Sequence, residues 1–194
     1  MAIKTFTTGE VLTASATNEF LANSGLVFVK GVSQVGSVAS INVTSCFSAT
    51  YDAYRVVLSS VTLTSNGNGT FIYCKMLSGT TPANSNYNYG IPRVDMASGA
   101  ISSIVQQGGT SGIVVGTGNA SDSTSASFDI VNPFAARFTN FNGLAQTNST
   151  GGYCGAGAGV HGTSSSYDGI QLIASTGNIS NAAIIVYGYR YGIS

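Results

Sequence analysis

From Leu26 onward, apolar and polar residues alternate along the chain in short segments. Alternation with a period of two is typical of β-strands that bury one face. The segments are rich in β-branched and aromatic residues, and turn-forming residues separate them about every 8 to 12 positions. No helical period is visible between them, which argues against a parallel α/β fold. Strands are predicted at residues 26–35, 37–43, 54–64, 70–77, 87–91, 100–107, 111–118, 125–134, 136–147, 152–162, 169–175 and 182–192.

The number and spacing of these strands predict an all-β domain over residues 26–194, with the architecture of an antiparallel β-sandwich or jelly roll. Within it, the run "SNGNGT" at residues 65–70 contains Asn-Gly twice. Asn-Gly between two alternating segments is the strongest short-range signal for a hairpin. The two strands that flank this run are therefore predicted to be antiparallel neighbours.

The middle of the chain, residues 78–127, has a less regular pattern. The segment "TTPANSNYNYGIPRVDMASG" contains two of the three prolines and several turn formers. It predicts a long loop with one short strand around Tyr87–Ile91, because proline and turn formers interrupt strands. The segments 100–107 and 111–118 are predicted to be edge strands.

The first 25 residues differ from the rest of the chain. Thr13 or Ser15 could cap a short helix through "ATNEFLAN", and Gly25 could end it. A helix of about ten residues is marginal by itself in water, so it must lie on something. Residues 1–25 are therefore predicted to be an arm that docks onto the body of the chain or onto a neighbour. The apolar side chains expected to make that contact are Phe6, Val11, Leu12, Phe20 and Leu21.

Charged residues make up 7% of the chain, whereas an average soluble domain has about 25%. Seven Lys and Arg balance seven Asp and Glu, so no basic field is present to attract nucleic acid. The hydrophobic fraction of 43% argues against disorder. A polar but nearly uncharged surface lacks the repulsion that keeps monomers apart. We therefore expect much of the surface to be covered by partners or by further copies of the chain.

No apolar run approaches the ~18 residues of a membrane span, and the opening "MAIKTFTTGE" lacks the apolar core of a signal peptide. Membrane insertion and export through a secretory pathway are therefore not expected. The three cysteines, Cys46, Cys74 and Cys154, have no metal-ligand spacing. They are predicted to be reduced, buried thiols, and neither a metal nor a cofactor is predicted.

Two segments repeat one pattern: "TYDAYRVVLS" at residues 50–59 and "SYDGIQLIAS" at 166–175. In each, a Tyr-Asp pair precedes a strand: Tyr51–Asp52 and Tyr167–Asp168. We interpret both as corners, with an Asx-turn at the Asp and a buried tyrosine whose hydroxyl bonds to the backbone. The alternative is a glycosidase-like carboxylate pair, ~5–10 Å apart in a cleft. No other feature supports that alternative, and the chain has no Trp to stack on a sugar.

His161 is the single histidine, and Ser164, Ser165 and Ser166 follow it. A hydrolase triad is not predicted because no Gly-x-Ser-x-Gly elbow is present. The ring is instead expected to face solvent or to be locally bonded. The preceding "GAGAGV" resembles a dinucleotide loop only superficially, since no helix follows it, and a tightly packed strand is predicted.

Near the end of the chain, Tyr187, Tyr189 and Tyr191 alternate and therefore share one face of a strand. We interpret this face as the aromatic side of a core strand. A surface for carbohydrate or for a protein partner is the alternative.

Four segments resemble those of small structural proteins of tailed bacteriophages, including cyanophages and marine phages. They are "TFTTGEVLTASATNEFLANSGLVFVK", "ATYDAYRVVLS", "VNPFAARFTNF" and "IIVYGYR", and together they extend over most of the chain. The first contains the opening F-x-x-G-x-V-L-T-A that is common in that group. Such proteins are described as tail-fibre, head-decoration or uncharacterised virion proteins. The resemblance implies a virion component, and none of the four segments is a catalytic motif.

The expected function is that of a capsid cement or decoration protein, made in the host cytoplasm and incorporated into the virion. We expect a homotrimer that docks by its arm onto the major capsid protein or a tail component. A long tail fibre is not expected, because coiled-coil and fibrous repeats are absent. The alternative is a short tail fibre that binds host polysaccharide through the loops 83–90 or 145–153. A depolymerase is a third class, but it needs converging acids, and the chain has five Asp and two Glu.

Overall fold

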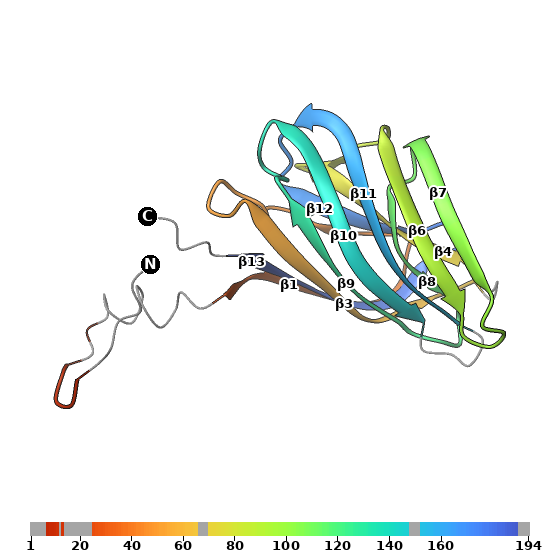
Figure 1. Cartoon of the computed structure of the whole chain (residues 1–194), viewed down its shortest axis with the longest axis horizontal. Helices are drawn as coiled ribbons and strands as arrows, with labels where there is room; N and C mark the ends of the chain where they lie inside the picture. Colours follow the sequence, from red (N-terminus) through yellow and green to blue (C-terminus); the bar gives the residue numbers. More distant parts are fainter. Residues whose placement is uncertain (1–6, 12, 14–24, 66–69, 148–151, 190–194) are drawn as a thin grey trace.

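The computed structural model of this chain describes residues 7–11, 13, 25–65, 70–147 and 152–189, which form an all-β fold (Figure 1). The strands are β1 (Leu26–Val38), β2 (Ser40–Val43), β3 (Ala53–Leu63), β4 (Thr70–Ser78), β5 (Thr81–Pro82), β6 (Tyr87–Asp95), β7 (Ile101–Gly109), β8 (Ile113–Gly118), β9 (Thr124–Val131), β10 (Arg137–Thr147), β11 (Tyr153–Ser165), β12 (Gly169–Ala174) and β13 (Ile179–Tyr189).

The strands form two sheets in which every pairing is antiparallel. The large sheet has eight strands in the order β1-β13-β3-β9-β10-β11-β6-β7. The small sheet has the order β2-β12-β4-β5, and β8 also pairs with β4, on the side opposite β12. The prediction of an all-β, antiparallel fold with the character of a sandwich is therefore confirmed. The large sheet ends in β1 and β7, and Leu26 of β1 is the register partner of Tyr189 in β13.

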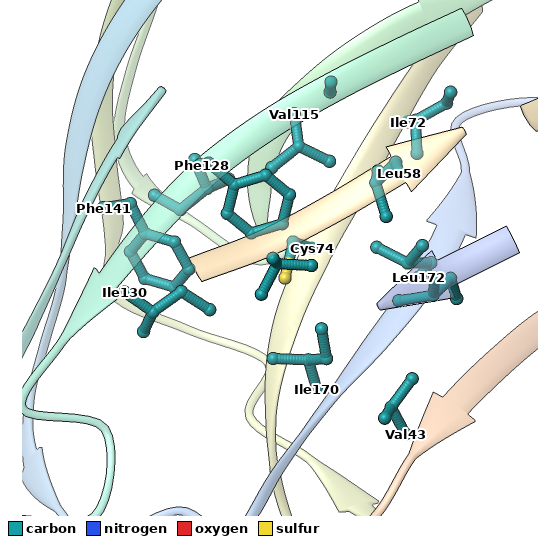
Figure 2. Packing of buried hydrophobic residues seen from close by; sticks show 14 of the residues in the cluster. Val43, Leu58, Ile72, Cys74, Val115, Phe128, Ile130, Phe141, Ile170 and Leu172 are labelled. Carbon is teal, nitrogen blue, oxygen red and sulfur yellow. The ribbon is translucent and has the colours of Figure 1, made fainter. Parts of the chain in front are cut away.

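The alternation along each strand decides which side chains enter the core. In β3, Tyr54, Val56 and Leu58 are buried, whereas Arg55 and Val57 point away from the small sheet. Each fully buried aliphatic or aromatic side chain contributes about 1.5–3 kcal/mol to folding. Figure 2 shows the resulting core, in which both sheets and β8 contribute side chains. It labels Phe128, Ile130 and Phe141 from the large sheet, Val115 from β8, and Ile170 and Leu172 from β12.

The predicted hairpin around residues 65–70 is wrong. β3, on one side of it, pairs with β13 and β9 in the large sheet. β4, on the other side, pairs with β12, β5 and β8 in the small sheet. Both strands bury one face against the same core, so they face each other across it instead of lying side by side. Residues 66–69 lie outside the described part of the chain.

The middle of the chain contains more strand than predicted. β6 continues through Pro92 to Asp95 and pairs with both β11 and β7, because Tyr87, Tyr89 and Ile91 turn their side chains to the core. The two predicted edge strands are confirmed for the described residues, since β7 ends the large sheet and β8 pairs only with β4. Unlike a typical edge, β8 is buried along its whole length.

The segment "GAGAGV" lies in β11, as predicted, and its glycines let other parts of the structure approach closely. A Cβ on Gly157 would lie 2.6 Å from Cγ1 of Ile91, and one on Gly159 would lie 2.8 Å from Cδ1 of Ile113. Both distances are too short for carbon atoms that are not bonded. Glycine is therefore required where β11 meets β6 and β8.

The predicted docking arm falls mostly outside the described residues. This holds for the proposed helix and for Phe6, Leu12, Phe20 and Leu21. Val11 is described, and its side chain is 81% exposed. The first strand begins at Leu26. Docking of residues 1–25 stays a prediction.

Candidate functional site

The two Tyr-Asp segments meet at one turn of the chain. The backbone N–H of Asn132 donates a 2.7 Å hydrogen bond to the carbonyl of Asp52. The N–H of Tyr167 donates a 2.8 Å hydrogen bond to the carbonyl of Pro133, the next residue of that turn. The repeated segments are therefore structurally linked, although more than a hundred residues separate them in the sequence.

The two aspartates have different roles. The Asp168 carboxylate accepts a 2.8 Å hydrogen bond from the backbone N–H of Gly79, in the loop after β4. Its carbonyl accepts the N–H groups of Cys46 and Phe47, at 2.8 and 3.0 Å. This long-range contact takes the place of the Asx-turn predicted at Asp168. Asp52 has an exposed side chain and is connected through its backbone.

The corner tyrosine is Tyr54, three residues after the predicted Tyr51. Its hydroxyl accepts a 2.8 Å hydrogen bond from the Ser48 N–H and donates a 2.9 Å one to the Ser48 carbonyl. This bond back to upstream backbone is the defining feature of a tyrosine corner. Tyr51 packs edge-on against Tyr54, with ring centroids 5.6 Å apart, and covers Gly188. In the first segment the corner bond is therefore made by Tyr54 and not by Tyr51. Among the described contacts, none joins the Tyr167 hydroxyl to the backbone, so the corner in the second segment stays a prediction.

The expectation that His161 faces solvent is wrong. Its side chain is 1% exposed on β11 and packs between Tyr87 and Tyr167, at centroid distances of 4.6 and 5.1 Å. Neither ring nitrogen has a hydrogen-bond partner of good geometry among the described residues. Burial lowers the pKa of His161, and the backbone of Ser85 opposes this effect only in part. The neutral ring therefore acts as a third aromatic side chain in this cluster.

The cysteines are placed differently from one another. Cys46 and Cys74 are buried, as predicted, and burial raises the pKa of Cys46 to about 12 and also raises that of Cys74. Thiols with so high a pKa are poor nucleophiles at neutral pH. Cys154 is only partly buried, which corrects the prediction for that residue. In the described ranges, no group of three or more His, Cys, Asp or Glu side chains is arranged to hold a metal ion.

The surface of the large sheet that points away from the small sheet, here called the outer face, exposes several large apolar side chains. Phe28 is 63% exposed, Leu144 64%, Val105 68% and Ile101 81%. Soluble monomers rarely expose large contiguous apolar areas, and those that occur are often functional. The outer face is therefore the strongest candidate for a functional surface.

Part of the outer face forms a hollow of about 720 Å³, here called the outer hollow. Cross-strand pairing explains it: Leu144 of β10 lies opposite Ala156 of β11, and Val94 of β6 lies opposite Ile101 of β7. Small side chains thus lie between larger ones. Its lining includes the apolar residues Val57, Pro92, Val94, Ile101, Leu144 and Ala156.

The outer face also has one neutralised charge pair. Arg55 binds Asp129 through two hydrogen bonds of 2.8 Å, and the hydroxyl of Tyr189 donates a third, of 2.7 Å. Burial raises the pKa of Asp129, but the bonds from Arg55 and Tyr189 outweigh it and leave this pKa below its usual value. The pair adds no net charge to the face.

The aromatic side of β13 belongs to this same face. Its buried side consists of Ala182, Ile184 and Val186, whereas Tyr187 and Tyr189 are half-buried on the outer face. β13 is therefore a core strand with one aromatic face, as predicted, but that face points away from the small sheet and is only half-buried. Tyr191 lies outside the described residues.

In the described part of the chain, no helix is long and apolar enough to cross a membrane. No family model, curated protein or solved structure matches the chain.

Proposed function

We propose that this chain is a structural protein of a tailed-phage virion, which acts through assembly and not through catalysis. The observation that carries the proposal is the outer face, where large apolar side chains are exposed on a nearly uncharged protein. Such a surface is suited to contact with other subunits, because it loses little hydration of charged groups when it is covered. The sequence segments that resemble phage virion proteins support the same class.

Within that class, we favour a capsid cement or decoration protein with a jelly-roll topology. The sandwich would project from the particle as an oligomer of this chain, and residues 1–25 would bind the major capsid protein. Two compact sheets without a described stalk support this arrangement over a long fibre. In this arrangement, the apolar side chains of residues 1–25 would contact the capsid protein.

The tail-fibre alternative depends on loops that bind glycan, and the structure weakens one of them. In the segment 83–90, Tyr87 and Tyr89 are buried and unavailable for stacking on a sugar. The Asn86 amide donates to the Thr163 hydroxyl at 3.0 Å, and the Asn88 amide oxygen accepts the Gly108 N–H at 2.8 Å. The polar groups of this loop therefore bind other parts of the same chain.

The proposal is tested on particles of the phage that encodes the chain. Mass spectrometry of gradient-purified particles should detect it, and labelled antibodies should place it over the capsid surface. Label confined to the tail tip would replace the decoration role with the tail-fibre alternative. Absence of the chain from purified particles would refute the virion assignment.

The role of the arm needs a second experiment. The variant Phe20→Ser/Leu21→Ser should fail to rebind particles that lack the protein, because its apolar contacts are lost. The control Val35→Ser changes an apolar residue that is 81% exposed on β1, and it should rebind normally. Normal occupancy of the arm variant would show that residues 1–25 do not attach the protein.

A further inference from the structure

We infer that β7 is an interface at which a second copy of this chain pairs strand to strand, so that the two large sheets become continuous. The inference rests on the proposed function, because it supplies a contact by which copies of the chain assemble. That contact is twofold, so it gives a dimer in place of the homotrimer expected from the sequence. The interface is the β7 edge of the large sheet, and the partner is a second copy of this chain.

The first reason is that β7 is an unprotected edge. Among the strands described, it pairs only with β6, so its other side presents unpaired N–H and C=O groups. Bare edges of this kind favour pairing with another strand, and proteins block them with charges, proline or bulges. β7 has no charged residue and no proline, and its one register shift lies near its end, between Gln106 and Gly109.

The second reason is the contrast with β1, the other end of the same sheet. β1 has two register shifts, near Lys30 and near Val38. It also contains a charged residue, Lys30, whose Nζ donates a 2.5 Å hydrogen bond to the carbonyl of Thr44. Bulges and lysine are the usual means of blocking an edge. One edge is therefore protected and the other is open.

The third reason identifies the partner as a copy of this chain. In an antiparallel pair about a twofold axis, residues of β7 face residues of β7, and like charges placed opposite each other would be destabilising. β7 has none, and the chain has a formal net charge of +0. With the twofold axis at Ser103, pairing places Ile101, 81% exposed, opposite Val105, 68% exposed, of the second copy, and the reverse. The apolar outer face then continues across the interface.

Cross-linking of the full-length protein tests this geometry. Ser103 is exposed in the regular part of β7, and Ser33 is exposed on β1. In a Cys154→Ser background, a short bis-maleimide should cross-link Ser103→Cys into a covalent dimer and leave Ser33→Cys monomeric. Cross-linking only in a mixture of the two variants would show that β7 pairs with β1, and it would overturn the inference.

A charge variant tests the energetics. Sedimentation equilibrium should show a dimer, and Val105→Lys should raise its dissociation constant by about tenfold or more, because each lysine then lies against the apolar Ile101 of the second copy. The control Val35→Lys places the same charge at an exposed site on β1 and should leave the constant unchanged. A monomeric wild-type protein, or equal effects of both variants, would overturn the inference. Circular dichroism checks that both variants fold.

The two proposals can fail separately. Dimerisation through β7 of a protein that is absent from phage particles would refute the virion role and leave the interface standing. A protein that is present in particles but insensitive to Val105→Lys, both in dimerisation and in occupancy, would refute the interface alone.

Discussion

His161 lies edge-on to Tyr167, with ring centroids 5.1 Å apart and ring planes at 80°. The contact connects β11 to the corner that begins β12, and Tyr87 of β6 packs on the histidine as well, at 4.6 Å. His161 thus belongs to a buried aromatic cluster with Tyr87 and Tyr167. Because burial disfavours the charged ring and the backbone of Ser85 offsets this only in part, protonation of His161 is unfavourable in the folded protein.

The stability of the protein should therefore fall as the pH decreases below about 6.5, the ordinary pKa of histidine. Burial lowers the pKa of His161 in the folded state, so the unfolded chain binds the proton first. The free energy of unfolding should decrease by up to ~1.4 kcal/mol per pH unit until the folded-state pKa is reached. Urea denaturation at several pH values measures this slope.

His161→Phe is the matched control for that experiment, because it keeps an aromatic ring in the cluster and removes the only histidine. Its stability should be nearly constant over the same pH range. Parallel losses in the variant and the wild type would show that other groups cause the pH dependence.

The unequal roles of the two corner aspartates should appear in their stability effects. Asp168→Ala should cost about 1 kcal/mol, because the Gly79 N–H loses its acceptor. Asp52→Ala should change stability by less than about 0.5 kcal/mol, since that side chain is exposed. Thermal denaturation of both variants tests this, and equal losses would contradict the assignment.

The close approach at β11 predicts a steric effect of one methyl group. Gly157→Ala should destabilise the protein by about 1–3 kcal/mol, because Ile91 occupies the space that the new Cβ needs. Gly90→Ala, on the adjacent strand β6, meets nothing within 4 Å and should shift stability by less than about 0.5 kcal/mol. Similar melting temperatures for the two variants would rule out the close contact.

The charge pair on the outer face should be measurable by a double-mutant cycle. Asp129→Asn and Arg55→Met should show a coupling of about 1 kcal/mol at neutral pH, because the pair is bidentate but partly exposed. The lowered pKa of Asp129 means that this contribution is present above its ordinary value of 3.8 and is lost as the pH falls through the lower, folded-state value. A coupling near zero would show that solvent screens the pair completely.

Alternation was sufficient to predict the β-class and most strand positions, because inward residues such as Val56 and Leu58 recur every second place. It did not predict which strands pair. The Asn-Gly run predicts a hairpin, but it connects the two sheets, because a turn motif specifies a change of direction and not which strands pair. The strand predicted at Tyr87–Ile91 stops before Pro92, because proline usually interrupts an interior strand, whereas β6 continues to Asp95.

The candidate surface was harder to predict for a related reason. Both sides of β13 are apolar, with Ile184 and Val186 on one and Tyr187 and Tyr189 on the other. Only the position of the small sheet decides which side is covered. The exposure of Leu144 likewise depends on what packs over β10, and local sequence does not contain that information.

Leu26 pairs with Tyr189, so the chain enters and leaves the sandwich at neighbouring points, beside the edge strand β1. A short linker between these points would allow circular permutation, with new ends in the turn between β6 and β7. Sequences fused before Leu26 or after Tyr189 would emerge from the same corner of the domain. Because β7 ends the sheet on its other side, such fusions would leave that edge accessible, and the domain could carry a displayed peptide without covering the interface proposed there.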